Sequence, residues 1–195
     1  MNYNKGICKS ENGETYNGQF IIDGKGVYKW KNGDMYNGQW NHDIRNGKGV
    51  YTWKNGDVYK GQWKKDKMHG KGVYKYKNGD FDGLWKNKKF VLGKATLKNK
   101  RGTYKGQWKR KSMNGKGVYT WKNGDVYKGQ WKSGVMHGKG EYKYNNGKIC
   151  KGTWKNGEDY GKYNVIEPNG PKYRGTCKRV LSKNNRKTRR KYKKN

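Results

Sequence analysis

The chain repeats one short pattern along almost its whole length. The pentapeptide Tyr-Lys-Gly-Gln-Trp occurs at residues 59–63 and again at 127–131. Related pentapeptides begin at positions 16, 36, 59, 81, 104, 127, 150 and 173, in steps of 20 to 23 residues. A fixed period in this range predicts a repeat architecture, in which each unit buries its surface against its neighbours. We therefore expect one elongated array of units rather than a compact globule.

Each unit has the pattern of a β-hairpin. In residues 47–63, two runs of alternating residues flank an Asn-Gly pair at 55–56, which is a strong hairpin signal. A three-residue loop that ends in a left-handed Gly56 pairs Tyr51 with Tyr59 and places every tyrosine, tryptophan and glycine on one face. A two-residue loop would put the aromatic residues of the two strands on opposite faces. The pattern favours the three-residue loop.

The connection to the next hairpin is expected to be longer. Continuing the register sets Trp63 opposite Gly47 on one side and Gly70 on the other. Glycine neighbours would let the indole lie flat over bare backbone. Residues 64–69 then form a loop in which His69 is a turn residue, because Asn and His tolerate left-handed backbone. This interpretation argues against a metal-binding or catalytic histidine.

The charge balance limits the class of partner. The 195 residues include 48 Lys or Arg against 14 Asp or Glu, a formal net charge of +34. Residues 178–195 hold ten basic and no acidic residues, so the rest of the chain still carries +24. Solubility needs far less charge, so we expect the surface to attract a polyanion, whether anionic lipid, nucleic acid or acidic protein. The alternative is that lysine only keeps a sheet rich in glycine and aromatic residues in solution.

The three cysteines stand where other units carry aromatic residues. Cys150 replaces a tyrosine, Cys177 replaces a tryptophan, and Cys8 matches Tyr28. Each is expected to be a packing substitute rather than a disulfide partner or nucleophile, which suits a reducing compartment. Met1–Ser10 lacks the apolar core of a secretory signal, and no stretch approaches the ~20 apolar residues of a membrane span. We expect an intracellular protein, either cytoplasmic or peripheral to a membrane.

The order of motifs within a unit resembles a known repeat. Tyr-x-Gly-x-Trp, then Gly-x-Gly-x-Tyr, then Asn-Gly, at a period of 23, is similar to the MORN (membrane occupation and recognition nexus) repeat. The resemblance implies an all-β fold, an elongated single-layer antiparallel sheet of about eight stacked hairpins that forms a trough lined by the aromatic face. It places a repeat domain at residues 1–177, with a half-repeat at 6–13 and units starting near the eight positions above. Residues 178–195 have the composition of a disordered basic tail.

One segment departs from the pattern. Residues 86–103 lose the Gly-x-Gly-x-Tyr-x-Trp strand and contain Gly93, Ala95 and Leu97 in its place. A kink, a bulge, a site specific to one partner and simple degeneration of the repeat are all compatible with this change.

No catalytic or cofactor-binding constellation accompanies the repeat. The Gly-x-Gly pairs open strands and precede no helix, so they are not nucleotide-binding fingerprints, and no Cys or His cluster has metal-ligand spacing. The sequence predicts a protein that is not an enzyme and needs no cofactor or metal. MORN proteins act as membrane-associated scaffolds, and several assemble end to end. The resemblance therefore implies a structural scaffold that binds other proteins, docks on anionic surfaces such as phospholipid membranes, and forms homo-oligomers or end-to-end assemblies.

Two sets of residues are expected to carry the binding. The first is the aromatic face, with Tyr36, Trp40, Tyr59, Trp63, Tyr74, Tyr104, Trp108, Tyr127 and Trp131. The second is the basic tail, which would bind anionic partners through Lys178, Arg179, Lys183, Arg186, Lys187, Arg189, Arg190, Lys191, Lys193 and Lys194.

The alternative function is nucleic-acid binding, or a structural role in the virion of a large DNA virus. The tail would bind phosphates without sequence preference. An aromatic trough could also stack single-stranded bases, although its rings are already needed to cover glycines. The sequence leaves open which polyanion, which partner and which oligomeric state apply.

Overall fold

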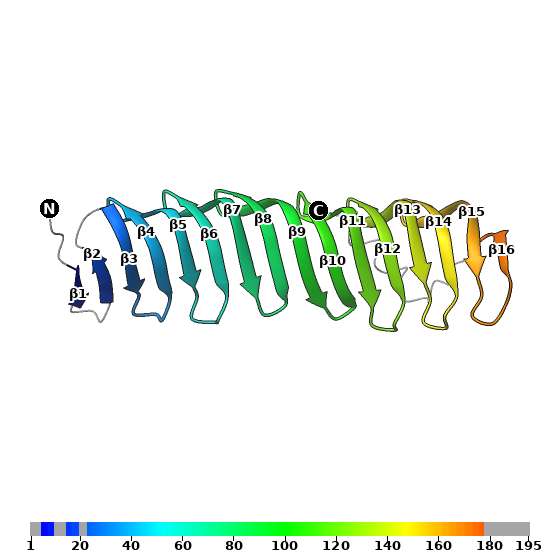
Figure 1. The fold of residues 1–195 in the computed structure, drawn as a ribbon, viewed down its shortest axis with the longest axis horizontal. Coiled ribbons are helices and arrows are strands. Elements are labelled where there is room, and N and C mark those ends of the chain that lie inside the picture. Colours follow the sequence, from blue (N-terminus) through cyan, green and yellow to red (C-terminus); the bar gives the residue numbers. More distant parts are fainter. Residues whose placement is uncertain (1–4, 10–14, 20–22, 178–195) are drawn as a thin grey trace.

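The structure is a computed structural model that describes residues 5–9, 15–19 and 23–177, and these residues form only strands and turns. Sixteen strands make one antiparallel sheet in which each strand pairs with the next in sequence (Figure 1). This confirms the all-β, single-layer prediction. The predicted tail at 178–195 and residues 10–13 of the half-repeat lie outside the described residues, so the domain boundary stays a prediction.

The strands follow one another with the bounds β1 (Lys5–Lys9), β2 (Thr15–Gln19), β3 (Asp23–Lys29), β4 (Met35–Asn41), β5 (Ile44–Thr52), β6 (Val58–Lys64), β7 (Lys67–Tyr76), β8 (Gly79–Lys86), β9 (Lys89–Asn99), β10 (Gly102–Lys109), β11 (Ser112–Trp121), β12 (Val126–Lys132), β13 (Val135–Lys143), β14 (Ile149–Lys155), β15 (Glu158–Ile166) and β16 (Lys172–Gly175).

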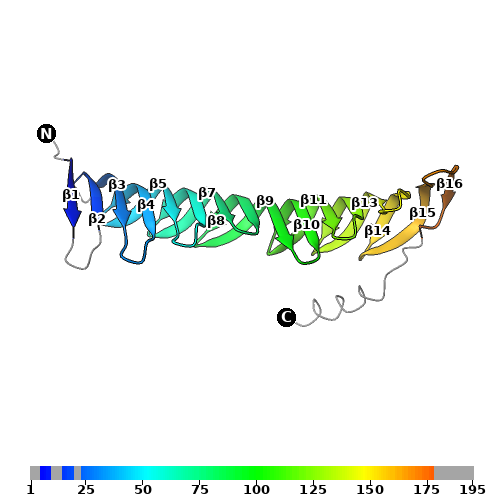
Figure 2. The same cartoon turned by 90° about the horizontal axis from the view of Figure 1, so that it is seen from below.

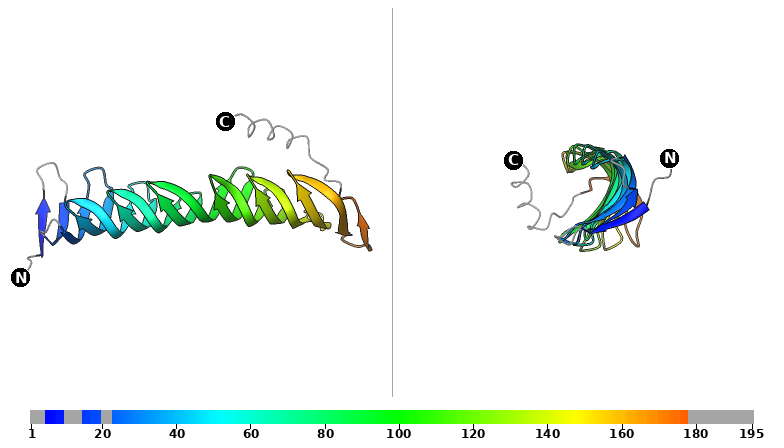
Figure 3. Two further views of the ribbon diagram at one scale, coloured as in Figure 1. Left: turned by 90° about the horizontal axis from the view of Figure 1, so that it is seen from above. Right: turned by 90° about the vertical axis from the view of Figure 1, so that its left-hand side faces the viewer.

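The sheet is long, narrow and curved across its width. The strands lie side by side along the long axis in Figures 1 and 2, and the end-on view in Figure 3 shows a crescent. Because the described strands form a single layer, only the inside of the crescent can bury a large ring completely. Tyr36, Tyr59 and Tyr127 are 0% exposed. The aromatic face is therefore the concave one, and the residues that alternate with it lie on the convex face.

The Asn-Gly turns at 32–33, 55–56, 123–124 and 146–147 have the predicted geometry, whereas the turn at 78–79 has only two residues and the connection at 169–170 has five. Tyr51 pairs with Tyr59 across the turn at 55–56. The backbone N–H of Trp53 donates to the carbonyl of Asp57 at 2.9 Å, and these two residues close the turn. Gly56 has a left-handed φ of 86°. The predicted three-residue loop is confirmed, because the intervening residues are 54 to 56.

The other connections are tight turns, which corrects the predicted loop at 64–69. β6 ends at Lys64 and β7 begins at Lys67, so only Lys65 and Asp66 form the turn. Both have positive φ, 48° and 59°, as in the type I′ turn that suits the twist of a hairpin. The prediction failed because this turn type normally shows Asn-Gly or Asp-Gly, and neither dipeptide is present here.

A β-bulge takes up the residues that the loop would have used. Trp63 lies opposite Met68, not opposite Gly70 as predicted, because β7 carries extra residues at this point. Gly70 takes the left-handed conformation with φ of 60°. The side-chain oxygen Oε1 of Gln62 accepts a hydrogen bond from the N–H of Lys71 at 3.0 Å. The glutamine side chain therefore accepts a hydrogen bond from a backbone N–H that, because of the bulge, has no carbonyl partner on the neighbouring strand.

Tyrosine rings, rather than indoles, cover the paired glycines. A Cβ at Gly72 would lie 2.6 Å from Cζ of Tyr59, and one at Gly61 would meet the same phenol, so the ring lies flat on the pair. The Tyr59 hydroxyl donates to the carbonyl of Gln62 at 3.0 Å. Trp63 stands edge-on to this ring, at 86° with centroids 5.2 Å apart. The predicted flat indole is wrong, because the tyrosine reaches the glycine two residues further along its own strand.

A disulfide joins two of the cysteines near the C-terminal end. This corrects the prediction that each cysteine only substitutes for an aromatic residue in the packing and forms no disulfide. The tyrosine of one unit normally packs against the tryptophan of the next, as Tyr127 and Trp154 do with centroids 5.1 Å apart. Cys150 and Cys177 occupy the same two positions one unit later. They therefore face each other and form a disulfide with Cα atoms 6.1 Å apart. The cysteines no longer support a reducing compartment.

The irregular segment 86–103 stays in the sheet. β9 pairs with β8 on one side and β10 on the other. Leu84 lies opposite Leu92 and Trp85 opposite Phe90, so this bulge is one residue smaller than the bulge in β7. The segment is a variant bulge, which was one of the alternatives that the sequence left open.

Candidate functional site

Most of the aromatic residues predicted to bind a partner lie in the core. Six are buried, namely Tyr36, Tyr59, Trp63, Tyr104, Tyr127 and Trp131. Trp40, Tyr74 and Trp108 are partly exposed and pack against the buried rings. A buried ring offers a partner no surface, so a partner in the concave trough is expected to touch these three. Binding by this face stays a prediction.

Aspartate–tyrosine pairs link successive hairpins, a role that the sequence reasoning missed. The Tyr74 hydroxyl donates to Oδ2 of Asp57 at 2.6 Å, and the available signal was the 17-residue interval between them. Burial and this bond raise the pKa of Tyr74 to about 12. The equivalent bond from Tyr51 to Asp34 is 2.8 Å long. Burial raises the pKa of Asp34, but hydrogen bonds from the Lys54 backbone and from two side chains outweigh it, so that the net shift of this pKa is downward.

One arginine occupies an aromatic box on the concave face. Cζ of Arg45 lies 4.7 Å from the ring centroid of Trp63 and 5.0 Å from that of Tyr51. Its Nε donates to Oδ1 of Asp66 at 2.8 Å. Three later units pack a methionine against the core here, namely Met68, Met113 and Met136. This box is thus filled by a cation that the chain itself supplies, together with its counter-ion.

The convex face carries a row of exposed lysines, one on each odd-numbered strand from β3 to β15. Their cross-strand neighbours are uncharged in most units, as Gln39 opposite Lys25 and Gln130 opposite Lys116. Two strand spacings separate consecutive members, which is about 9.5 Å. This lysine row consists of Lys25, Lys48, Lys71, Lys94, Lys116, Lys139 and Lys162.

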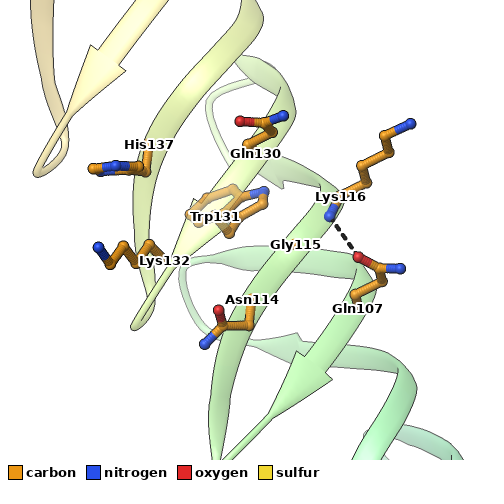
Figure 4. Close-up of a pocket in the computed structure, with 8 residues that line it drawn as sticks. All are labelled: Gln107, Asn114, Gly115, Lys116, Gln130, Trp131, Lys132 and His137. Atoms are coloured by element: carbon orange, nitrogen blue, oxygen red, sulfur yellow. Dashed lines mark hydrogen bonds between the residues drawn. The ribbon is translucent and has the colours of Figure 1, made fainter.

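A polar concavity of about 450 Å³ lies on strands β10 to β13 (Figure 4). The backbone N–H of Lys116 donates to Oε1 of Gln107 at 2.9 Å at one side of it. His137 lines the other side from within β13, and the left-handed residue is the next one, Gly138, with φ of 62°. The predicted role of these histidines as turn residues is therefore wrong. The polar side chains that line the concavity are Gln107, Asn114, Lys116, Gln130, Lys132 and His137.

The described part of the chain contains no group of three His, Cys, Asp or Glu side chains that could hold a metal ion. Within the same residues, no helix has the length and apolar character needed to cross a bilayer. The ten basic tail residues predicted to bind anionic partners lie beyond residue 177, outside the part that the structure describes.

Two solved structures show a distant likeness to the chain. One is the SAS-4 (dCPAP) TCP domain of Drosophila melanogaster in complex with a proline-rich motif of Ana2 (dSTIL). It is 15% identical over 88% of this chain and 89% of that chain, with a TM-score of 0.40. The other is selenomethionine-substituted virginiamycin B lyase from Staphylococcus aureus, 12% identical over 91% and 71% of the two chains, with a TM-score of 0.16. Neither likeness is close enough to bear on function.

The sequence itself matches a family model. No curated protein sequence matches the chain. The model of the MORN repeat matches residues 21–35, 36–58, 59–81, 104–126 and 127–149, together more than half of the chain. Four of these matches begin at the first residue of a Tyr-x-Gly-Gln-Trp motif. The chain therefore belongs to the MORN-repeat family.

Proposed function

We propose that the protein is a non-enzymatic scaffold that binds protein partners and docks on an anionic surface, such as a phospholipid membrane, through its convex face. The family supports a scaffold role in protein interaction. The observation that supports surface docking is the lysine row, seven exposed ammonium groups in line along one face. Each lysine near an anionic leaflet contributes about 1 kcal/mol, so a row of seven is ample for peripheral attachment.

The curvature of the sheet favours contact along this row. A surface that is convex across its width meets a flat membrane along a line parallel to its long axis (Figure 3). The concave trough then faces away from the membrane and stays accessible to protein partners through Trp40, Tyr74 and Trp108. These three residues lie on β4, β7 and β10, so the sheet would hold such contacts at set intervals of three strands, about 14 Å.

The test compares two variants of the full chain that lose the same charge at different places. One replaces Lys48, Lys71, Lys116 and Lys139 of the row by glutamine. The control replaces Lys31, Lys54, Lys77 and Lys122, which are exposed at the tips of the Asn-Gly turns. Cosedimentation with phosphatidylserine-containing vesicles and with neutral phosphatidylcholine vesicles measures binding across a salt series.

The row variant is expected to bind anionic vesicles up to about a thousandfold more weakly, and the tip variant much less so. Equal losses in the two variants would mean that only net charge matters. A chain that ends at residue 177 separates the contribution of the tail. Tighter binding to duplex or single-stranded DNA than to vesicles at the same salt concentration would instead favour the nucleic-acid function.

Self-assembly has a separate test. An open sheet leaves β1 and β16 as edges to which another strand could pair. If molecules assemble end to end through these edges, raising the protein concentration should produce oligomers whose mass increases in steps of one chain. Analytical ultracentrifugation measures these masses.

A further inference from the structure

The concavity in Figure 4 has a counterpart three units earlier in the chain. The C-terminal site contains Gln107, Asn114, Gly115, Lys116, Gln130, Trp131, Lys132 and His137. The same residue types occur in the same order at Gln39, Asn46, Gly47, Lys48, Gln62, Trp63, Lys64 and His69, which we call the N-terminal site. Each other stretch of the described sheet lacks at least one glutamine or the histidine of this set.

The two sites also have the same local geometry. The N–H of Lys48 donates to Gln39 Oε1 at 2.6 Å, as the N–H of Lys116 donates to Gln107 Oε1 at 2.9 Å. The bulge glycine has φ of 84° in the N-terminal site and 73° in the C-terminal site. Equal sequence and equal hydrogen bonds make these two copies of one site.

Both sites lack a partner for a buried polar atom. The Nδ1 atoms of His69 and His137 are inaccessible to solvent and make no hydrogen bond within the described residues. Because solvent does not reach these atoms, they are a feature that the two copies share rather than a ligand contact, and the groups open to a partner are the amides and ammonium groups. The other polar side chains are amides and ammonium groups, all able to donate, and no carboxylate lines the site. Such a set of donors suits an anionic oxygen.

An apolar pair lies midway between the two sites on the same face. Leu84 of β8 and Leu92 of β9 are opposite each other and are 41% and 43% exposed. Leu84 stands where five other units carry glutamine. The N-terminal site spans β4 to β7 and the C-terminal site β10 to β13, so their centres are six strands apart, about 29 Å, with the leucines about 14 Å from each.

We propose that the convex face binds an extended acidic segment of a protein partner, with one carboxylate group in each site and aliphatic side chains on the leucine pair. An extended chain covers about 3.3 Å per residue, so the two acidic positions would be about nine residues apart. The net charge of +34 favours an acidic partner. A polypeptide fits better than a nucleic acid because only it supplies aliphatic side chains at the centre. This inference rests on the proposed function, in which the chain binds protein partners and its convex face recognises an anionic partner, and it means that an acidic segment and an anionic membrane would compete for Lys48 and Lys116.

The probe is a fluorescein-labelled peptide with glutamate pairs about nine residues apart, two central leucines and serine or threonine elsewhere. Fluorescence anisotropy with the full-length protein measures its affinity. Replacing the two peptide leucines by serine, or bringing the glutamate pairs closer by about four residues, should each weaken binding about tenfold.

Three protein variants locate the contact. The first, Leu84→Gln with Leu92→Thr, introduces the glutamine of other units at position 84 and a residue common in strands at position 92. It should weaken binding about tenfold without changing the salt dependence of binding. Lys48→Gln with Lys116→Gln should weaken binding about tenfold and flatten the salt dependence. The control, Lys54→Gln with Lys122→Gln at the turn tips, loses the same charge and should change affinity less than about twofold.

Affinity that follows net charge alone, with all lysine variants equal and no effect of the leucines, overturns the proposal. A single-stranded oligonucleotide that displaces the peptide, and whose own binding needs Lys48 and Lys116 but not the leucines, would assign the face to nucleic acid and also overturn it. If the peptide fails while the lysine row still docks on anionic vesicles, this inference falls and the proposed scaffold function stands.

Discussion

The packing of tyrosine over paired glycines predicts that adding one methyl group to the sheet will be costly. In Gly72→Ala the new Cβ would lie 2.6 Å from Cζ of Tyr59, closer than atoms approach in contact. The ring must then leave the glycine pair, and its hydroxyl loses the 3.0 Å bond to the Gln62 carbonyl. Overpacking costs about 1–3 kcal/mol and the lost hydrogen bond about 1 kcal/mol. Alanine loses less backbone entropy on folding than glycine does, and this offsets about 0.5–1 kcal/mol of the cost. We expect a net loss of about 2–3 kcal/mol.

A matched control separates crowding from backbone strain. Gly56 has a left-handed φ of 86° and no atom within 4 Å of where a Cβ would stand. Gly56→Ala should therefore cost only the strain of that conformation, about 1–2 kcal/mol. Urea unfolding followed by tryptophan fluorescence gives both free energies.

The decisive measurement is a double-mutant cycle with Tyr59→Val. Removing the ring removes the collision, so Gly72→Ala should then be neutral or stabilising by about 0.5 kcal/mol. Gly56→Ala should cost the same in both backgrounds, because its strain does not involve the ring. An unchanged cost of Gly72→Ala without the Tyr59 ring would refute the packing described here.

Three further predictions concern other parts of the sheet. Burial raises the pKa of Tyr36 and Tyr59 to about 12. In the unfolded chain the phenol has a pKa near 10. The contribution of each ring to the free energy of unfolding is therefore complete below pH ~10 and declines by about 1.4 kcal/mol per pH unit between pH ~10 and pH ~12. Alkaline titration of circular dichroism should show this loss, and stability that rises in that window would contradict it. Cys177→Ser opens a loop between cysteines 27 residues apart. It should cost up to about 3.5 kcal/mol and increase hydrogen exchange in β15 and β16 only, so faster exchange throughout the sheet would argue against a local role. Arg45→Met introduces the residue of later units and should change thermal stability by less than about 1 kcal/mol, whereas Arg45→Ala should cost about 2–4 kcal/mol. Equal losses in these two Arg45 variants would show that the charge, not the filling of the box, matters.

The architecture could be predicted because its signals are local and repeated. The period of the pentapeptide indicates the number of hairpins, and the Asn-Gly pair at 55–56 indicates the turn. The alternation of residues then determines which side chains share a face, and the pairing of Tyr51 with Tyr59 followed directly.

The details that were missed depend on contacts between strands. Lys65 and Asp66 form a type I′ turn without its usual residues, because the two strands around them determine the geometry. The bulge that this turn requires moved Trp63 away from Gly70. That shift left the glycine pair to be covered by tyrosine, which no reading of one strand alone could show.

The candidate site was predictable only in part. The excess of positive charge was evident, but its arrangement in a row needed the register of every strand. The disulfide between Cys150 and Cys177 was predictable in principle, because Tyr-to-Trp packing between units brings these two positions together. That rule became visible only once the ring contacts were known.

The hydrogen bonds from tyrosine to aspartate and the packing of tryptophan on the preceding tyrosine both reach only one hairpin away. A whole unit inserted between two others would therefore find every one of its partners already present. The molecule can grow or shorten in evolution by complete hairpins without redesign of its interior. Each such change would move whatever is attached to the two ends by one fixed increment.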